Sequence, residues 1–591
     1  MVGGEINSIL AADIGRQWTK VLLLERVEGV FRFVTRGQAP TSLVGPSEAD
    51  GVLAGLRAAI RQIERITGRV LLRGDDLITP EDADGHGVDA LAATTSAAQN
   101  LSVVIAGLGE VSSLEAARQA AKTTYCDVRA TVSANGGLSR GLPRRWSGLG
   151  AGGLGALEDE LFAQAPDVVV LVGGSDGGSV APAAELARSI AASGFTAAKD
   201  RPVVFAGNAE AQAAVAGALS GYANLRVVEN VAPARGVRNP EPLARELDSL
   251  FRERKLSSLP GRAALAGWGG RELEPGAAGF WLVLRFLAKQ YGLRVLGVDV
   301  GAETTLMGLA APSGLTRSVW PRMGTGDASA HLLDSVEAAA IARWAPFQCS
   351  EDHVRAYIAR RQAQPLATPE TTEQGWLELA LVRETLRALA PVGTADLILG
   401  CGGALGHVRH PGQAALALLD GLQPCGVCQL TLDSSLAASA LGAVALMQPE
   451  AAAQVLLADA LLPLGTAVCP SGNGRRGKTA LTVKVRPVDS DGEDKSMAGD
   501  VDPGPELNVQ VPFGEIAVVP VTPGKKIRLE LRPARGFDVG LGSGAAAALD
   551  LVPQGLGIIV DCRGRPFAPP TEPDERLLAV QDWNRALGAL D

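Results

Sequence analysis

Two short segments of the chain, 286 residues apart, repeat one frame of residues, and this repeat constrains the fold more than any other feature. Residues 13–20 read DIGRQWTK and residues 299–306 read DVGAETTL. In each, an Asp ends an apolar run, a Gly follows two residues later, and a Thr stands four residues after the Gly. A tight turn between two strands directs consecutive backbone N–H groups into a concavity that suits a phosphate, and the preceding Asp can hold hydrated Mg²⁺ or orient a water. The repeat predicts a duplicated fold with two phosphate-binding turns.

A third segment, residues 397–404 (LILGCGGA), has the pattern of a strand, a Gly-rich turn and the start of a helix. Because the glycines carry no side chains, a flat ligand such as adenosine could lie against the backbone and the helix start. Together the three segments predict a site for an adenine nucleotide.

The rest of the chain divides into four expected domains. Strand–turn–strand patterns at 8–34 and 294–320 predict two related lobes. Between them, apolar strands alternate with helical periods, which predicts an inserted parallel α/β domain. Beyond residue 454 apolar and polar residues alternate, which predicts an antiparallel β domain with a terminal helix and an acidic loop at 490–506. The expected boundaries are 1–87 for the first lobe, 88–240 for the inserted domain, 241–454 for the second lobe and 455–591 for the C-terminal domain.

The charge balance and the apolar pattern argue against several classes of protein. The chain has 55 Lys and Arg against 64 Asp and Glu, so it lacks the basic excess that binding of nucleic acid requires. No run of about 20 uncharged apolar residues predicts a membrane span. Seven Cys, an odd number spread over the chain, suit a reducing compartment. We therefore expect a cytoplasmic protein that binds neither nucleic acid nor membrane.

The order of the motifs resembles that of the actin, Hsp70 and sugar-kinase superfamily, in which two related lobes clamp a nucleotide between paired D-x-G turns. Within it, residues 10–25 (LAADIGRQWTKVLLLE) are similar to the D-I-G-S-T-x-T-K-V motif of the glutamate mutase L (MutL/GlmL) family. Residues 92–109, 171–179 and 202–208 resemble three further motifs of that family in the same order. The resemblance covers most of residues 8–450 and leaves the C-terminal β region outside it.

The resemblance implies a two-lobed actin-like (ribonuclease H-like) ATPase fold of the α/β class. The implied function is that of a chaperone or reactivating protein for an adenosylcobalamin-dependent aminomutase such as glutamate mutase. Its cofactors would be ATP and Mg²⁺, and its partners the mutase subunits, with a homo-oligomer and slow ATP hydrolysis compatible with it. The implied assignments are Asp13 and Asp299 for the metal and its water; Gly15, Arg16, Gln17, Thr19, Lys20, Gly301, Ala302, Glu303, Thr304 and Thr305 for the phosphates; and Gly400, Gly402, Gly403 and Ala404 for the adenosine.

Several residues depart from the family pattern and leave alternatives open. Arg16 and Gln17 replace two hydroxyl residues, and Arg16 could either bond a phosphate or plug an empty site. Leu306 replaces a carboxylate, for which Glu303 could substitute, and Gln99–Asn100 replace two glycines. The alternatives are a small-molecule kinase of the same superfamily and a catalytically degenerate scaffold.

Four other features have an ordinary and a functional interpretation. Asp176 in a Gly-rich loop either serves a ligand or forms a turn. The Cys425–Cys428 pair lacks the further ligands of a zinc site, so packing is favoured. His407 and His410 follow the adenosine-like turn and are more often surface residues than ligands. For Trp18, packing of the turn onto its lobe is favoured over stacking on a base.

Overall fold

The computed structural model describes residues 5–43, 50–108, 111–133, 164–193, 195, 201–220, 224–268, 272–389, 394–488 and 506–590. Its first lobe is a five-stranded sheet in the order β3-β2-β1-β6-β12, in which β1, β2 and β3 are antiparallel and β6 and β12 continue in parallel. The elements are β1 (Ser8–Ile14), β2 (Trp18–Val27), β3 (Val30–Pro40), α1 (Gly51–Thr67), the hairpin β4 (Leu72–Arg73) and β5 (Asp76–Leu77), β6 (Ala90–Thr95) and β12 (Glu274–Pro275). The helix α1 buries Leu53, Leu56, Ile60 and Ile63 against the sheet, as their spacing predicts.

The second lobe repeats this order as β15-β14-β13-β16-β17. Its strands are β13 (Val295–Val300), β14 (Thr304–Ala311), β15 (Gly314–Pro321), β16 (Leu397–Cys401) and β17 (Gly426–Asp433). Its helices are α9 (Ser329–Leu332), α10 (Ala338–Ala342), α11 (Glu351–Ala363), α12 (Thr372–Leu389), α13 (Gly403–Gly406) and α14 (Pro411–Leu422). The same order in two lobes confirms the duplicated two-lobed fold.

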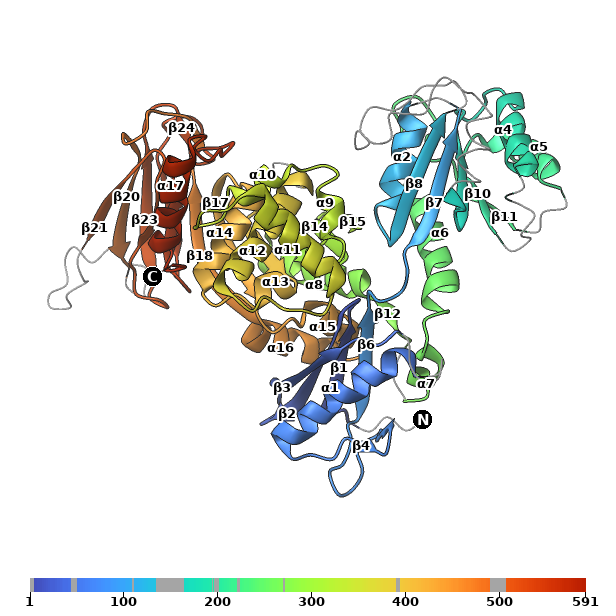
Figure 1. Cartoon of the computed structure of the whole chain (residues 1–591), viewed down its shortest axis with the longest axis horizontal. Coiled ribbons are helices and arrows are strands. Elements are labelled where there is room, and N and C mark those ends of the chain that lie inside the picture. Colours follow the sequence, from blue (N-terminus) through green and yellow to red (C-terminus); the bar gives the residue numbers. More distant parts are fainter. Residues whose placement is uncertain are drawn as a thin grey trace.

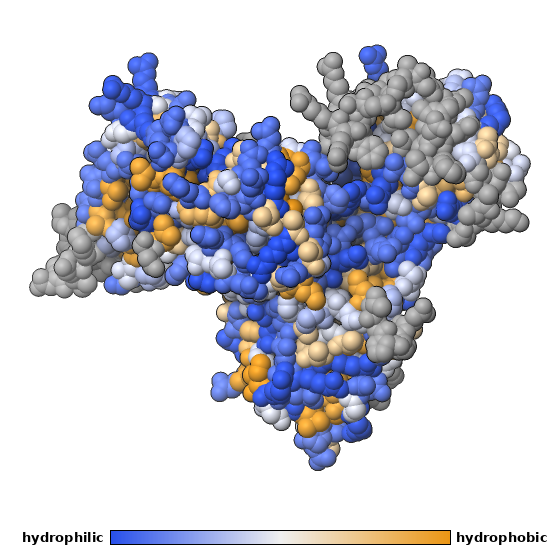
Figure 2. All heavy atoms as spheres, in the orientation of Figure 1, coloured by the Kyte–Doolittle hydropathy of each residue, from blue (hydrophilic) through white to orange (hydrophobic). Residues whose placement is uncertain are grey.

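The inserted domain is a parallel five-stranded sheet in the order β11-β10-β9-β7-β8. Its elements are β7 (Leu101–Gly107), α2 (Val111–Ala121), β8 (Cys126–Ser133), β9 (Val168–Val172), α4 (Ala181–Ala192), β10 (Val203–Phe205), η3 (Ala209–Ala211), α5 (Gln212–Ala218) and β11 (Leu225–Val227). The chain returns through α6 (Glu241–Phe251), η4 (Arg252–Leu256) and α7 (Arg262–Ala266). Figure 1 shows this domain standing apart from the lobes, and Figure 2 shows that the surface where it joins them is largely hydrophilic.

Sheet membership differs from the expected domain boundaries at both ends of the insertion. The strand β6 lies beyond residue 87 but pairs with β1, and β12 lies beyond residue 240 but pairs with β6. Both strands therefore belong to the sheet of the first lobe. The reason is that parallel pairing is nonlocal, so alternation along the sequence does not reveal which sheet a strand joins.

The C-terminal region contains the expected antiparallel sheet, ordered β21-β20-β23-β25, and also extends the second lobe. Three of its strands, β18, β26 and β22, continue the second lobe's sheet beyond β17, and β18 pairs with β26 in parallel. The elements are α16 (Pro449–Val455), η5 (Leu456–Ala460), β18 (Leu461–Cys469), β19 (Ser471–Gly472), β20 (Thr479–Pro487), β21 (Leu507–Pro512), β22 (Ile516–Val519), β23 (Ile527–Pro533), β24 (Phe537–Asp538), β25 (Ala547–Leu551), β26 (Ile558–Asp561) and α17 (Pro573–Ala586). The acidic loop expected at 490–506 lies almost wholly outside the described residues.

Two helices, α8 (Gly276–Tyr291) and α15 (Ala438–Ala445), pack against each other between the lobes. They touch backbone to backbone, because a Cβ atom on Gly279 would lie 2.1 Å from the Ser439 carbonyl oxygen and one on Gly442 would lie 2.0 Å from the Gly279 carbonyl oxygen. Glycine at both positions therefore permits the close approach of the two helices.

Candidate functional site

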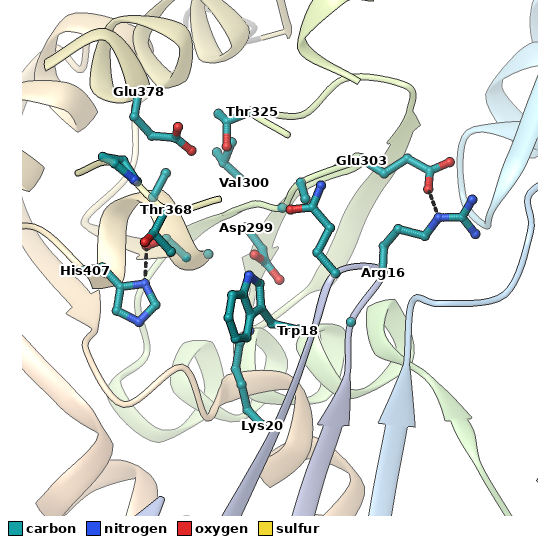
Figure 3. A pocket seen from close by; sticks show the side chains of 18 of the residues that line it. Arg16, Trp18, Lys20, Asp299, Val300, Glu303, Thr325, Thr368, Glu378 and His407 are labelled. Carbon is teal, nitrogen blue, oxygen red and sulfur yellow. Dashed lines mark hydrogen bonds and ion pairs between the residues drawn. The ribbon is translucent and has the colours of Figure 1, made fainter. Parts of the chain in front are cut away.

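One cavity of about 470 Å³ lies between the lobes and is lined by all three segments that the sequence singled out. In Figure 3, Trp18 and Asp299 lie near its middle, Thr325, Thr368 and Glu378 lie on another side, and Arg16 and Glu303 lie at one edge. Of the predicted site residues, those that line it are Asp13, Gly15, Arg16, Gln17, Lys20, Asp299, Gly301, Ala302, Glu303, Thr304, Gly402, Gly403 and Ala404. The two repeated turns therefore face the same space.

The two turns have the same backbone geometry. The Gly15 N–H donates to the Trp18 carbonyl oxygen at 3.0 Å, and the Gly301 N–H donates to the Thr304 carbonyl oxygen at 3.0 Å. A Cβ atom on either glycine would lie 2.8 Å from that same carbonyl oxygen. Both turns therefore depend on glycine for the same steric reason, which explains the frame seen in the sequence.

Three predicted contacts do not line the cavity. The Thr19 hydroxyl is buried and hydrogen-bonds the Thr41 hydroxyl at 2.8 Å, and the Thr305 hydroxyl donates to the Met323 carbonyl oxygen at 2.6 Å. Gly400 lies inside β16, where an added Cβ would meet Leu418 at 3.0 Å. Side chains alternate between the two faces of a strand, so Trp18 and Lys20 face the cavity while Thr19 faces the core.

The adenosine-like turn approaches the second phosphate turn closely. Gly402 has a φ of 102°, and a Cβ atom there would lie 2.2 Å from the Val300 carbonyl oxygen. Gly403 and Ala404 then begin α13 with their backbone on the cavity wall. The absence of side chains leaves a flat backbone surface of the kind that a nucleoside can lie against.

The carboxylates at the ends of β1 and β13 have different surroundings. Asp13 accepts from the Lys20 ammonium at 3.3 Å and from the Thr94 hydroxyl at 3.3 Å. Burial raises the pKa of Asp299 to about 7, with Lys20 opposing this and the carboxylates of Asp13 and Asp433 adding to it. Two carboxylate groups that face one cavity form a suitable donor set for a hydrated Mg²⁺.

The raised pKa of Asp299 gives a prediction about the ligand-free protein. Between about pH 4 and 7 the folded protein binds a proton at Asp299 that the unfolded chain releases, so the free energy of unfolding should fall as pH rises through this window. We expect a loss of about 1 kcal/mol from this residue between pH 5.5 and 7. Denaturant unfolding of the wild type and of Asp299→Asn measures it. In Asp299→Asn the free energy of unfolding should not show this fall between pH 5.5 and 7. In Asp396→Asn, which changes an exposed partner of Arg294, the fall should be the same as in the wild type. Equal slopes in wild type and Asp299→Asn would contradict the assignment.

The residues that depart from the family pattern bond to one another across the cavity. Arg16 Nε lies 2.9 Å from Glu303 Oε2, and the Asn100 amide donates to Glu303 Oε1 at 3.3 Å. The Gln17 amide donates to Asp327 Oδ1 at 3.3 Å. These contacts link the first turn to the second, and the cavity is not filled by the Arg16 side chain (Figure 3).

The helices of the second lobe supply cavity residues that the sequence did not identify. Arg361 on α11 donates through Nε to the Thr325 carbonyl oxygen at 3.3 Å and lies 3.7 Å from Glu378 on α12. The Tyr357 hydroxyl donates to Glu378. No local motif marks such residues, because helices bring them to the site from positions far apart in sequence.

The remaining candidates separate into cavity residues and structural ones. The Trp18 and His407 side chains line the cavity, and burial lowers the pKa of His407. His410 instead caps α14. Asp176 Oδ1 accepts from the Ala209 N–H and the Asn230 amide, each at 2.9 Å, which supports its interpretation as a turn former.

Cys425 and Cys428 are both free thiols, half-buried and buried respectively. Burial raises the pKa of each. Within the described part of the chain, neither belongs to a group of three or more side chains placed to hold a metal ion, which supports packing.

Two lobes with the same strand order, each presenting a glycine turn to one cavity, define an actin-like fold of the class that binds nucleotides between its lobes. The chain belongs to the MutL protein family, whose model matches residues 9–460. This confirms the family resemblance seen in the sequence. Across the described residues, no helix combines the length and apolar character needed to span a membrane.

Solved structures with a similar arrangement are distant. They include nucleotide-free acetone carboxylase (11% identity, 86% of this chain and 82% of that chain, TM-score 0.33), glycerol dehydratase reactivase (10%, 75% and 100%, 0.29) and component A of (R)-2-hydroxyglutaryl-CoA dehydratase from Acidaminococcus fermentans (8%, 76% and 99%, 0.27). Because these TM-scores are low, the fold assignment does not depend on these structures. It rests on the strand orders and on the family match. No curated protein matches the chain.

Proposed function

We propose that the chain binds ATP with Mg²⁺ between its lobes and acts as an accessory protein, a chaperone or reactivating factor, of an adenosylcobalamin-dependent mutase. The observation that carries the nucleotide part is the convergence of both phosphate turns and the adenosine-like turn on one cavity. The link to a mutase is supported by membership of the MutL family.

In this proposal each part of the cavity has one task. The backbone of residues 15–18 and 301–304 holds the phosphates, with Lys20 beside them, and residues 402–404 hold the adenosine. Asp13 and Asp299 hold the hydrated metal ion, which when bound neutralises phosphate charge. Because each lobe supplies one turn, one ligand can draw the lobes together, and closure would move the inserted domain and the C-terminal region.

A catalytically degenerate scaffold is the second candidate, because specific contacts favour it. The ion pair between Arg16 and Glu303 already joins the two turns. Leu306 pairs with Asp299 at the position where Lys20 pairs with Asp13, so an apolar side chain replaces a charged one on the second turn. A small-molecule kinase would need a carboxylate in the cavity as a general base. Glu378 does not favour this function, because it accepts a hydrogen bond from Tyr357 and lies beside Arg361.

Isothermal titration calorimetry of the purified chain tests the proposal. We expect ATP with Mg²⁺ to bind with a Kd in the micromolar range, about −8 kcal/mol. Asp299→Asn should weaken binding about 30-fold in the presence of Mg²⁺, because it removes one charged metal ligand, and should change little in EDTA.

The control is Asp396→Asn, which removes an exposed carboxylate outside the cavity and should bind like the wild type. Absence of binding with and without Mg²⁺ would exclude the nucleotide function. Hydrolysis that rises when an adenosylcobalamin-dependent mutase is added would favour the accessory protein, whereas binding without any hydrolysis would favour the scaffold.

A further inference from the structure

The inserted domain contributes one side chain to the wall of the nucleotide cavity. Tyr125 directly precedes β8 and lines the cavity together with Gly276, the first residue of α8. The residue is only 2% exposed. Its ring stacks on Phe251 of α6 with 5.2 Å between ring centroids. Tyr125 thus connects the cavity to β8 of the inserted domain and to α6, through which the chain leaves that domain.

The hydroxyl group of Tyr125 lies at the N-terminus of α8. It accepts a hydrogen bond from the Ala277 N–H at 3.1 Å. Gly276 is its neighbour on the cavity wall, where an added Cβ atom would lie in van der Waals contact with the same oxygen at 3.4 Å. Among the described residues, no acceptor is recorded for the phenolic proton itself. A buried donor without an acceptor that lines a cavity is suited to a ligand.

The helix adds a second feature that favours an anion. The N-cap residue of α8 is Pro275, which forms no side-chain cap. The Tyr125 hydroxyl is therefore the side-chain acceptor in the first turn of this 16-residue helix, and the positive end of the helix dipole is directed at the cavity where Gly276 lines it. Helix N-termini bind phosphate groups through this dipole and the N–H groups of the first turn.

The carboxylates nearby make this end of the cavity suited to an anion that binds together with a metal cation. The carboxylates of Asp299 and Asp13 act on the Tyr125 hydroxyl electrostatically, and burial, with these charges, raises its pKa, so the phenol stays a proton donor at neutral pH. A phosphate bound here would lie near the two carboxylates assigned to Mg²⁺.

We propose that the Tyr125 hydroxyl and the N-terminus of α8 form the subsite for the terminal phosphate of the bound nucleotide, and that the inserted domain senses through Tyr125 whether that phosphate is present. The proposal rests on the proposed nucleotide function and deepens it. The phenol would donate to a terminal phosphate oxygen while continuing to accept from Ala277. A nucleoside diphosphate would leave this donor without an acceptor. The stacked pair of Tyr125 and Phe251 would carry the difference to β8 and α6.

Calorimetry of Tyr125→Phe with a non-hydrolysable ATP analogue and with ADP tests the subsite. We expect the affinity for the triphosphate to fall about tenfold, because a hydrogen bond to a charged group is lost, and the affinity for ADP to change less than twofold. The matched control is Thr124→Val, which removes the neighbouring buried hydroxyl that donates to Asp248 outside the cavity, and it should leave both affinities unchanged. If Tyr125→Phe folds poorly, Gly276→Ala is the second variant: its methyl group would lie on the cavity wall in contact with the phenolic oxygen, where it should hinder a phosphate and reproduce the selective loss.

Hydrogen exchange gives a readout of sensing that affinity alone does not. In the wild type the triphosphate analogue should protect α6 and β8 more than ADP does, and in Tyr125→Phe this difference should vanish. An equal loss for both nucleotides, or no loss, would overturn the subsite. Wild-type protein that binds neither nucleotide would instead remove the proposed function itself, so the two failures are distinguishable.

Discussion

Replacing Asp561 by alanine is expected to lower the free energy of unfolding by about 3–5 kcal/mol, because it breaks a fully buried ion network on one side only. Asp561 accepts from Arg563 Nε and Nη2, each at 2.9 Å, and from Arg565 Nη2 at 2.7 Å. Asp561 is completely buried, and each arginine is less than a tenth exposed. Without the carboxylate, Arg565 would lose its main counter-charge inside the protein, and Arg563 would keep only Asp420.

The network also joins the C-terminal region to helices of the second lobe. Arg563 Nη2 lies 2.8 Å from Asp420 on α14, and Asp420 accepts from Arg383 on α12 at 2.8 Å. The helix α12 carries Arg383 and also lines the cavity through Glu378. The strand β26 and the cavity wall are therefore connected through one helix, so loosening the network should also change nucleotide affinity.

Denaturant unfolding of Asp561→Ala measures the loss. Its control is Asp582→Ala, which breaks an exposed pair with Arg585 on α17 and should leave stability unchanged within error. A loss below about 1 kcal/mol in Asp561→Ala would mean that the arginines find other partners and that the network does not hold the C-terminal region.

The parts of this molecule that could be predicted from sequence are those whose cause is local. The repeated residues around Gly15 and Gly301 form the same hairpin, and both hairpins need glycine because a Cβ atom would meet a backbone carbonyl oxygen. The repeat in the sequence therefore predicts both turns. Strand alternation would also have excluded Thr19 and Thr305 from the cavity, because each lies one residue from a neighbour that faces it. The partners of Glu303 could not be predicted, because Arg16 and Asn100 reach it only after the lobes and the insertion have folded together.

Nonlocal pairing explains the other differences. The strand β12 has two residues and no sequence pattern, yet it completes the first lobe's sheet through β6. The strands β18 and β26 lie 89 or more residues apart and pair in parallel, so the alternation that predicts them as strands cannot show that they extend the second lobe. Tyr125 and Glu378 reach the cavity for the same reason, from elements with no motif of their own.

Gly279→Ala is expected to destabilise the protein by about 3 kcal/mol or more, although alanine normally stabilises a helix interior relative to glycine by about 1 kcal/mol. The added methyl group would lie 2.1 Å from the Ser439 carbonyl oxygen and 3.0 Å from its carbon. A backbone carbonyl cannot rotate away as a side chain can, so α8 and α15 must separate, and overpacking of this kind is costly.

The separation should also reach the cavity between the lobes, because both helices begin there. Gly276 at the start of α8 and Ser439 in the first turn of α15 line it, and Asp433 holds the N-terminus of α15 by accepting from the Ala437 and Ala438 N–H groups at 2.9 Å. We therefore expect Gly279→Ala to lower both the free energy of unfolding and the affinity for nucleotide. The matched control is Gly217→Ala in α5, where an added Cβ meets nothing within 4 Å, and it should stabilise slightly. If Gly279→Ala behaved like Gly217→Ala, α8 and α15 would not be in backbone contact, and the proposed link between their packing and nucleotide affinity would be contradicted.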